Sequence, residues 1–388
     1  MSSTLPRPHL VPVYSASRGI VEGPSIRLPL GETVLGRDDG TGLLAFTGDT
    51  LVSRRHATLS VLDEPWRVRV EDLGSKNGTF INGRRIDAVG LVDGDLVRLG
   101  QSVFVLRWRS RSEEPASDLG GRAPAQGRMR DAIERIDGQA RLVLLHGPPG
   151  CVFDDAIAAV HRRFNPEGRM QTFDARNTPV DALAPALGGA ATVVVNGLTA
   201  LPPHAISTVT ASPMAPVILT ATEDPDSLAR RSAMPADVME RFDAIIRFPR
   251  LSERRDDLLG LLQAALGDDS PPLTIDLIET LLIYQWPGDL QELIEVASEL
   301  RIRGAGLDAL VTELVSPRLQ GHRFAARDEE DSRTEIDLRR PVPSQPDLEG
   351  LLAIHSGDVD SVASVLGRSR LQVVAWMQHY GLETGESG

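Results

Sequence analysis

The stretch Ser75-Lys76-Asn77-Gly78-Thr79-Phe80-Ile81-Asn82-Gly83 places an Asn-Gly pair on each side of a short apolar segment. Asn-Gly between short strand-like runs is typical of a tight β-hairpin, because both residues tolerate a positive φ. Outward from this stretch, further apolar runs recur at a spacing of roughly 8–12 residues, as they do in β-sandwiches. These runs are residues 26–28, 57–61, 67–70 and 103–106. The pattern predicts an all-β sandwich in the first block of the chain.

The turns between these runs carry side chains that suit a phosphate group. The groups are Gly36-Arg37, Ser53-Arg54-Arg55-His56, Ser75-Lys76-Asn77-Gly78-Thr79 and Asn82-Gly83. A phosphate dianion needs charge-assisted donors in a fixed array, and loops on a rigid sandwich can present one. Any one of these groups alone favours an ordinary hairpin turn. Together they favour a phosphate-binding site.

In this order and spacing the four groups resemble the forkhead-associated (FHA) domain over residues 24–108. The resemblance implies that Arg37 and Ser53 hold the phosphate of a phosphothreonine, whose methyl group the family accommodates in a pocket. It implies that His56 is structural and braces the binding loop. The remaining residues that it implies are Arg54 and Ser75 or Lys76, which assist at the phosphate, and Asn77 and Asn82, which orient the peptide backbone.

The middle block changes to apolar runs between amphipathic segments. Residues 142–145, 192–195 and 217–219 are typical of buried parallel strands. A P-loop has Gly, four residues and then Gly-Lys-Ser/Thr. Counted from Gly147, those last positions hold Val152, Phe153 and Asp154. The sequence therefore predicts a site that does not bind ATP productively.

The rest of this block resembles the AAA+ domain of NtrC-type regulators, which act at sigma-54 promoters. The resemblance rests on residues 241–242, 248–257 and 286–293 and implies an α/β domain with a helical subdomain. Asn196-Gly197 replaces the Asp-Glu of the family, and Gln291 replaces an arginine. Residues 171–191 lack the loop that engages sigma-54. We therefore expect no enzyme activity, no cofactor, no metal and no sigma-54 remodelling.

The last block has helical spacing only. Leu348, Leu351 and Leu352 predict one amphipathic helix, a second follows Asp358, and a third ends at Gly381. Helix, short turn and helix form the helix-turn-helix pattern. The block resembles the Fis-type domain, which implies DNA binding and a homodimer. The residues that would face DNA are Arg368, Ser369, Arg370 and Gln372; a helical dimerisation unit is the alternative reading.

Composition narrows the class of protein. A single cysteine, Cys151, excludes an internal disulfide framework and favours a reducing compartment. The chain has no apolar stretch of the roughly 18 residues that a membrane helix needs and no signal-peptide pattern. A net charge of −13 argues against a surface that wraps nucleic acid throughout and leaves room for a local DNA-binding element. We expect a cytoplasmic protein without a membrane partner.

These inferences predict an FHA domain (24–108), a linker (109–126), a degenerate AAA+ domain (127–320), a flexible linker (321–346) and an all-α helix-turn-helix domain (347–388). The leading hypothesis is a DNA-binding transcriptional regulator that docks a phosphothreonine protein and does not use ATP. The alternative is a phospho-dependent scaffold or antagonist that associates with active NtrC-type regulators without reading DNA.

Overall fold

The computed structural model describes residues 7–21, 23–37, 48–63, 66–109, 121–165, 167–211, 214–225, 227, 236–319, 343, 345–355, 357–359, 362–363, 373–374, 376–377 and 380–382. The chain divides into two compact units. The first unit comprises residues 1–114, 255–284 and 298–388, and the second comprises residues 115–254 and 285–297.

A β-sandwich forms the N-terminal part of the first unit, which confirms the predicted all-β block. One sheet has the order β2-β1-β11-β10-β7-β8, with β3 paired to β1, and the other has the order β4-β5-β6-β9. The strands are β1 (Arg7–Ser15), β2 (Gly19–Ile20), β3 (Ile26–Arg27), β4 (Gly31–Leu35), β5 (Ala57–Asp63), β6 (Trp66–Asp72), β7 (Thr79–Ile81), β8 (Arg84–Ile86), β9 (Ala88–Leu91), β10 (Leu96–Leu99) and β11 (Ser102–Arg109). Inward-facing apolar side chains of both sheets, among them Leu35, Leu59, Leu106 and Trp108, fill the interior.

The hairpin between β7 and β8 has the predicted two-residue turn. Asn82 and Gly83 both have positive φ, at 48° and 79°, as a type I′ turn requires. This geometry fixes the register in which Thr79 lies opposite Ile86 and Ile81 opposite Arg84.

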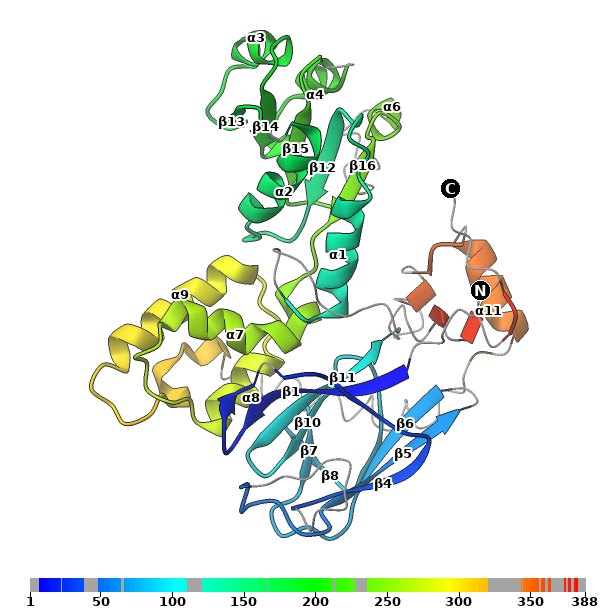
Figure 1. Cartoon of the computed structure of the whole chain (residues 1–388), viewed down its shortest axis with the longest axis vertical. Helices are drawn as coiled ribbons and strands as arrows, with labels where there is room; N and C mark the ends of the chain where they lie inside the picture. Colours follow the sequence, from blue (N-terminus) through cyan, green and yellow to red (C-terminus); the bar gives the residue numbers. More distant parts are fainter. Residues whose placement is uncertain are drawn as a thin grey trace. The chain divides into compact units, whose positions relative to one another are not determined.

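The sandwich extends further toward the N-terminus than the predicted boundary at residue 24. Strand β1 pairs antiparallel with β11 from Arg7 opposite Arg109 to Tyr14 opposite Val103, with an irregularity after Pro12. Figure 1 shows β1, drawn in blue, running beside β11. His9 and the prolines of this segment interrupt an alternating apolar pattern, so a strand here is hard to predict from the sequence.

The outer face of the first sheet is buried as well. Every residue of β11 is buried, although only alternate side chains, such as Phe104 and Leu106, point into the sandwich. Val103 and Val105 point to the opposite face, where α7 (Arg255–Leu266) packs on β1 and α8 (Ile275–Ile283) packs on α7. Figure 1 shows both helices beside β1 and β11. The sandwich and these helices therefore share one compact unit.

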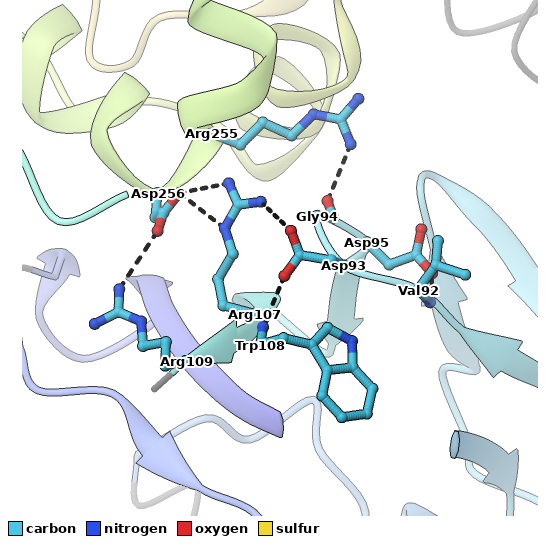
Figure 2. A network of polar contacts seen from close by, with 9 residues as sticks. All are labelled: Val92, Asp93, Gly94, Asp95, Arg107, Trp108, Arg109, Arg255 and Asp256. Carbon is cyan, nitrogen blue, oxygen red and sulfur yellow. Dashed lines mark hydrogen bonds and ion pairs between the residues drawn. The ribbon is translucent and has the colours of Figure 1, made fainter. Parts of the chain in front are cut away.

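A polar network at one end of β11 joins the sandwich to α7. Arg107 donates hydrogen bonds to Asp256 from Nε at 3.1 Å and from Nη2 at 2.6 Å, and its Nη1 donates to Asp93 at 3.2 Å. Asp93 also accepts the backbone N–H of Trp108, and Arg255 donates to the carbonyl of Gly94. Figure 2 shows Arg107 between Asp256 and Asp93, with Arg109 also on Asp256 and Arg255 on Gly94. Burial opposes the charged guanidinium, but the carboxylates of Asp256 and Asp93 outweigh it and raise the pKa of Arg107.

The second unit contains a parallel sheet of order β13-β14-β15-β12-β16. Its strands are β12 (Leu142–His146), β13 (Met170–Asp174), β14 (Thr192–Asn196), β15 (Val217–Ala221) and β16 (Ala244–Arg247). Leu142 and Leu144 belong to one apolar cluster, and Val143 and Leu145 to another. Both faces of the sheet are thus covered, as parallel sheets require. The predicted strands at 142–145, 192–195 and 217–219 are confirmed, and β13 and β16 add the edges.

The helices of the second unit are α1 (Pro124–Glu134), α2 (Asp154–Phe164), η1 (Val180–Ala182), α3 (Ala184–Leu187), η2 (Leu198–Ala200), α4 (Pro203–Thr210), α6 (Ala236–Met239) and η3 (Leu251–Arg254). Helix α9 (Asp289–Arg303) begins in the second unit and ends in the first. The first unit also contains η4 (Thr312–Leu314) and α11 (Gln345–Ile354).

The C-terminal block is described in part. Helix α11 confirms the helix predicted from Leu348, Leu351 and Leu352, and its apolar face packs with Val362, Trp376 and Met377. Gly381 has a φ of 69°, and the N–H of Leu382 donates to the carbonyl of Met377, which closes a helix end as predicted. Residues 364–372, which hold the turn of the predicted helix-turn-helix, lie outside the described part of the chain.

Candidate functional site

Two loops at one end of the sandwich, β4–β5 and β6–β7, meet around Ser53. The backbone N–H of Arg37, just after β4, donates to the Ser53 carbonyl at 2.9 Å. The N–H of Lys76, between β6 and β7, donates to Ser53 Oγ at 3.1 Å. The Asn77 amide donates to the carbonyl of Leu51 at 2.6 Å, which ties the same two loops together again. The structure thus brings Arg37, Ser53, Lys76 and Asn77 together, as the sequence predicted.

His56 braces these loops from inside the sandwich. Its ring is fully buried; Nδ1 accepts the N–H of Ser53 at 3.0 Å, and Nε2 lies 3.0 Å from the carbonyl of Gly78. A backbone N–H can only donate, so Nδ1 is the acceptor and Nε2 carries the proton that it gives to Gly78. The structural role predicted for His56 fits this geometry.

Ser75 shapes the turn and is buried beneath the loops. Its hydroxyl donates to Asp72 at 2.6 Å and accepts the N–H of Gly78 at 2.9 Å, while Thr79 donates to the same carboxylate at 2.7 Å. Partial burial alone would raise the pKa of Asp72, but the hydrogen bonds from Ser75 and Thr79 outweigh it and lower that pKa. Asp72 therefore remains an anion that anchors the turn.

The charged side chains of these loops point to solvent. Arg37, Arg54, Lys76 and the amide of Asn77 are exposed, and Ser53 is half-buried between them. Exposed guanidinium and ammonium groups on loops that meet at Ser53 can donate charge-assisted hydrogen bonds to a phosphate dianion. Because backbone contacts hold the loops in place, little ordering entropy would be lost on binding.

Asn82 lies on the β7–β8 turn. Its amide donates to Asp95 at 2.8 Å and accepts the N–H of Leu96 at 3.0 Å, so it holds the hairpin to the turn before β10. The peptide contact predicted for Asn82 stays a prediction.

Asp49 supports the loop and was not found by sequence reasoning. It is 3% exposed, and its carboxylate accepts the N–H of Leu51, the N–H of Gln101 and the hydroxyl of Ser102. A single Asp in a turn carries no specific signal, because its partners in the β10–β11 turn are distant in the sequence.

The loop after β12 packs against Phe248 and the start of α9. Phe153, at the position of a P-loop lysine, is 8% exposed and packs edge-to-face on Phe248 with ring centroids 4.7 Å apart. The N–H of Gln291 donates to the carbonyl of Gly150 at 3.2 Å, and a Cβ on Gly150 would collide with the carbonyl of Gly288. At the carboxyl end of β12, where open α/β sheets bind ligands, Gly150 thus lies against the start of α9.

The neighbouring polar groups of the second unit satisfy one another. Thr220 Oγ1 lies 3.2 Å from the Asn196 amide oxygen and accepts the N–H of Gly197 at 3.1 Å. Burial, followed by the charge of Asp289, raises the pKa of the Cys151 thiol to about 12, so this thiol is not a nucleophile near neutral pH.

The residues predicted to face DNA, Arg368, Ser369, Arg370 and Gln372, all lie outside the described residues. Within the described part of the chain, no group of three or more His, Cys, Asp or Glu side chains is arranged to hold a metal ion. No helix among the described residues is both long and apolar enough to span a membrane.

Comparison with known proteins identifies the N-terminal domain. The FHA domain family matches residues 33–100, so the chain contains an FHA domain. FHA domain-containing protein FhaB of Mycolicibacterium smegmatis is 37% identical over 103 residues, which are 26% of this chain and 63% of that protein. ABC transporter ATP-binding/permease protein Rv1747 of Mycobacterium tuberculosis is 41% identical over 89 residues, 22% of this chain and 10% of the transporter. The chain thus spans only part of the relatives that it matches.

Solved structures resemble either the FHA domain or most of the chain. NtrX of Brucella abortus, solved with ATP, covers 69% of this chain and 70% of its own at 17% identity and a TM-score of 0.46. A structure from work on phosphothreonine-dependent FHA domain interactions covers 26% of this chain and 97% of its own, at 28% identity and a TM-score of 0.23.

Proposed function

We propose that this protein is a transcriptional regulator that docks a phosphothreonine-containing protein through its FHA domain and acts at DNA without hydrolysing ATP. The observation that carries the proposal is that exposed Arg37, Arg54 and Lys76 lie on two loops that hydrogen bonds to Ser53 hold together. Phosphate is the ligand that such an array recognises best.

The second unit supports a role without catalysis. A lysine in place of Phe153 would be needed to reach a nucleotide phosphate, and carboxylates in place of Asn196 and Gly197 would be needed to hold magnesium. Phe153 instead packs on Phe248, and Gly150 lies against Gly288. Both contacts favour a structural role for the loop after β12. We infer that this AAA+-like unit relays or assembles rather than remodels sigma-54.

The proposal places the protein in the cytoplasm, where a Ser/Thr kinase would supply its partner. It also places DNA contacts on Arg368, Ser369, Arg370 and Gln372 and makes the C-terminal block a homodimer, which predicts a palindromic site. The net charge of −13 favours few phosphate contacts and modest DNA affinity.

The input is tested with matched phosphothreonine, phosphoserine and unphosphorylated peptide libraries on the full chain. We expect selective capture of phosphothreonine peptides and a loss of about tenfold or more in Arg37→Ala, since a charge-assisted hydrogen bond contributes about 1.5–3 kcal/mol. Arg69→Ala is the matched control, because Arg69 is an exposed arginine on β6 that faces Glu71. Equal capture of unphosphorylated peptides would refute the proposal.

The output is tested by recovering genomic DNA fragments with the full chain and sequencing them. Enrichment of a site that is lost in Arg370→Ala supports a DNA-binding regulator. No enriched site, together with co-purification of an active NtrC-type protein, would instead establish the phospho-dependent scaffold.

A further inference from the structure

The side chain of Arg98, on β10, connects α8 to the β10–β11 turn. This turn lies beside the two binding loops, which are the β4–β5 loop with Ser53 and the β6–β7 loop with Lys76. Its Nε donates to Glu279 on α8 at 2.8 Å, and its Nη1 donates to the carbonyl of Gly100 at 3.1 Å. The side chains of Arg98 and Glu279 are 13% and 2% exposed, so solvent screens this ion pair little. The Arg98 guanidinium thus joins the β10–β11 turn to α8, although Arg98 and Glu279 are 181 positions apart in the sequence.

The β10–β11 turn contacts the first binding loop, β4–β5, at Asp49 and Val52. Gly100 has a φ of 58°, and a Cβ there would lie 2.8 Å from Asp49 Oδ1 and 2.9 Å from Val52 Cγ2. The next two residues of the turn, Gln101 and Ser102, donate to the Asp49 carboxylate at 2.8 Å and 2.9 Å. A shift of the turn therefore moves the loop that ends in Ser53.

The same guanidinium also supports the second binding loop. Arg98 Cζ lies 3.7 Å above the ring centroid of Phe80, a cation–π contact. Phe80 directly follows the segment that carries Lys76 and Asn77, and it pairs with Arg98 across β7 and β10. Arg98 thus contacts Gly100, beside the loop of Ser53, and Phe80, on the strand that the loop of Lys76 and Asn77 leads into.

We propose that Glu279 is a positioning residue for the phosphothreonine site and acts through Arg98 on the loops of Ser53 and Lys76. The inference rests on the proposed phosphothreonine binding of the FHA domain and adds a route by which α8 sets the affinity of that site. Coupling between two places is reciprocal, so an occupied site also stabilises the contact of α8 with the sandwich. A partner that displaces α8 would weaken phosphopeptide binding.

A control variant distinguishes the effect of the Glu279–Arg98 pair from a general weakening of the contact between the helices and the sandwich. Asp256 on α7 also pairs with arginine on the sandwich, but its partner Arg107 lies on β11 beside Trp108. The strand runs from Ser102 at the loop end to Arg109, so at about 3.3 Å per residue Arg107 lies about 17 Å further from the loops. Asp256→Asn weakens the contact of the helices with the sandwich without touching the Gly100 turn.

The first measurement is amide hydrogen exchange in the full chain without peptide. We expect Glu279→Gln, which keeps the size of the side chain and removes its charge, to speed exchange at residues 49–53 by about fivefold or more. Asp256→Asn should leave exchange there unchanged. Unchanged exchange in Glu279→Gln, or equal acceleration in both variants, would overturn the inference. Arg98→Lys, which loses the fork that joins Glu279 to Gly100, repeats the test if Glu279→Gln does not fold.

The second measurement uses the best phosphothreonine peptide selected from the library. Glu279→Gln should bind it about fivefold more weakly, Asp256→Asn should match wild type, and the peptide should slow exchange across residues 275–283 only in wild type and Asp256→Asn. Peptide protection that is unchanged in Glu279→Gln would contradict the inference. A wild-type protein that selects no phosphothreonine peptide would refute the proposed function, while the peptide-free exchange would still decide whether Glu279 orders the loops.

Discussion

Arg107 and Asp256 form a buried, two-nitrogen contact between β11 and α7, with Nε and Nη2 both donating to Asp256 Oδ1 at 3.1 Å and 2.6 Å. The Asp256 side chain is fully buried and that of Arg107 is 5% exposed. Arg109 lies 3.6 Å from the other carboxylate oxygen, so one aspartate faces two arginines. This contact makes the helices after the α/β segment part of the same unit as the FHA domain.

Asp256→Ala is expected to destabilise the first unit by about 3–5 kcal/mol, because it removes the buried carboxylate that faces Arg107 and Arg109. Urea unfolding followed by tryptophan fluorescence measures the change, since Trp108 lies in the sandwich next to Arg107. Glu313→Ala, at an exposed position of the same unit, is the control and should change little. A variant as stable as wild type would show that the pair is not part of the folded interface in solution.

His56→Ala is expected to damage both stability and phosphopeptide binding. The substitution leaves the N–H of Ser53 and the carbonyl of Gly78 without the ring that joins them, which costs about 1–3 kcal/mol for each buried group. Because Ser53 is part of the site, the dissociation constant for the selected phosphothreonine peptide should rise about tenfold or more. Exposed His204→Ala serves as control, and binding that survives in a folded His56→Ala protein would contradict the bracing role.

Mild acid is expected to destabilise the first unit through His9. Burial, then the charges of Arg109 and Arg27, lower the pKa of His9 from 6.5 to about 4. Between pH 6.5 and about pH 4, His9 is protonated in the unfolded chain and neutral in the folded chain. The free energy of unfolding therefore falls as the pH drops from 6.5 toward 4. With solvent screening the loss between about pH 7 and about pH 5 is about 1 kcal/mol. His9→Gln should flatten the urea-midpoint profile over this window; an unchanged slope would show that His9 is not responsible.

Local signals accounted for much of the fold and of the phosphate site. The Asn82-Gly83 turn and the alternating runs fixed strands β5, β6, β7 and β11, because hairpin geometry depends on neighbouring residues. Strand β1 was missed, since its register with β11 joins residues about 95 positions apart. The roles of Arg98 and Asp49 were also missed, because each depends on partners that only the folded sheet brings near.

The division of the chain was harder to predict for the same reason. The sequence placed residues 255–284 in the AAA+-like domain (127–320), because residues 248–257 and 286–293 resemble that family, and this assignment stays a prediction. The structure groups them with the sandwich: α7 packs on β1, which pairs with β11, and Val103 and Val105 on the outer face of β11 are covered. An outward-facing valine in an alternating strand is a weak signal for such a cover, since isolated valines are common on protein surfaces.

Phe153→Lys is expected to lower stability without creating an ATPase, although it restores the lysine of a P-loop. The Phe153 ring belongs to the apolar cluster of the second unit and packs on Phe248, so a lysine there must bury its ammonium or leave a cavity. We expect a loss of about 3–5 kcal/mol in the second unit. Thermal unfolding measures the loss, and magnesium-dependent phosphate release measures hydrolysis. Val152→Lys, at a position that is 41% exposed, is the neighbouring control and should unfold like wild type. If Phe153→Lys folded normally and released phosphate, the loop after β12 would be a nucleotide site that only the phenylalanine inactivates. The contact of Gly150 with Gly288 would then have to open in solution.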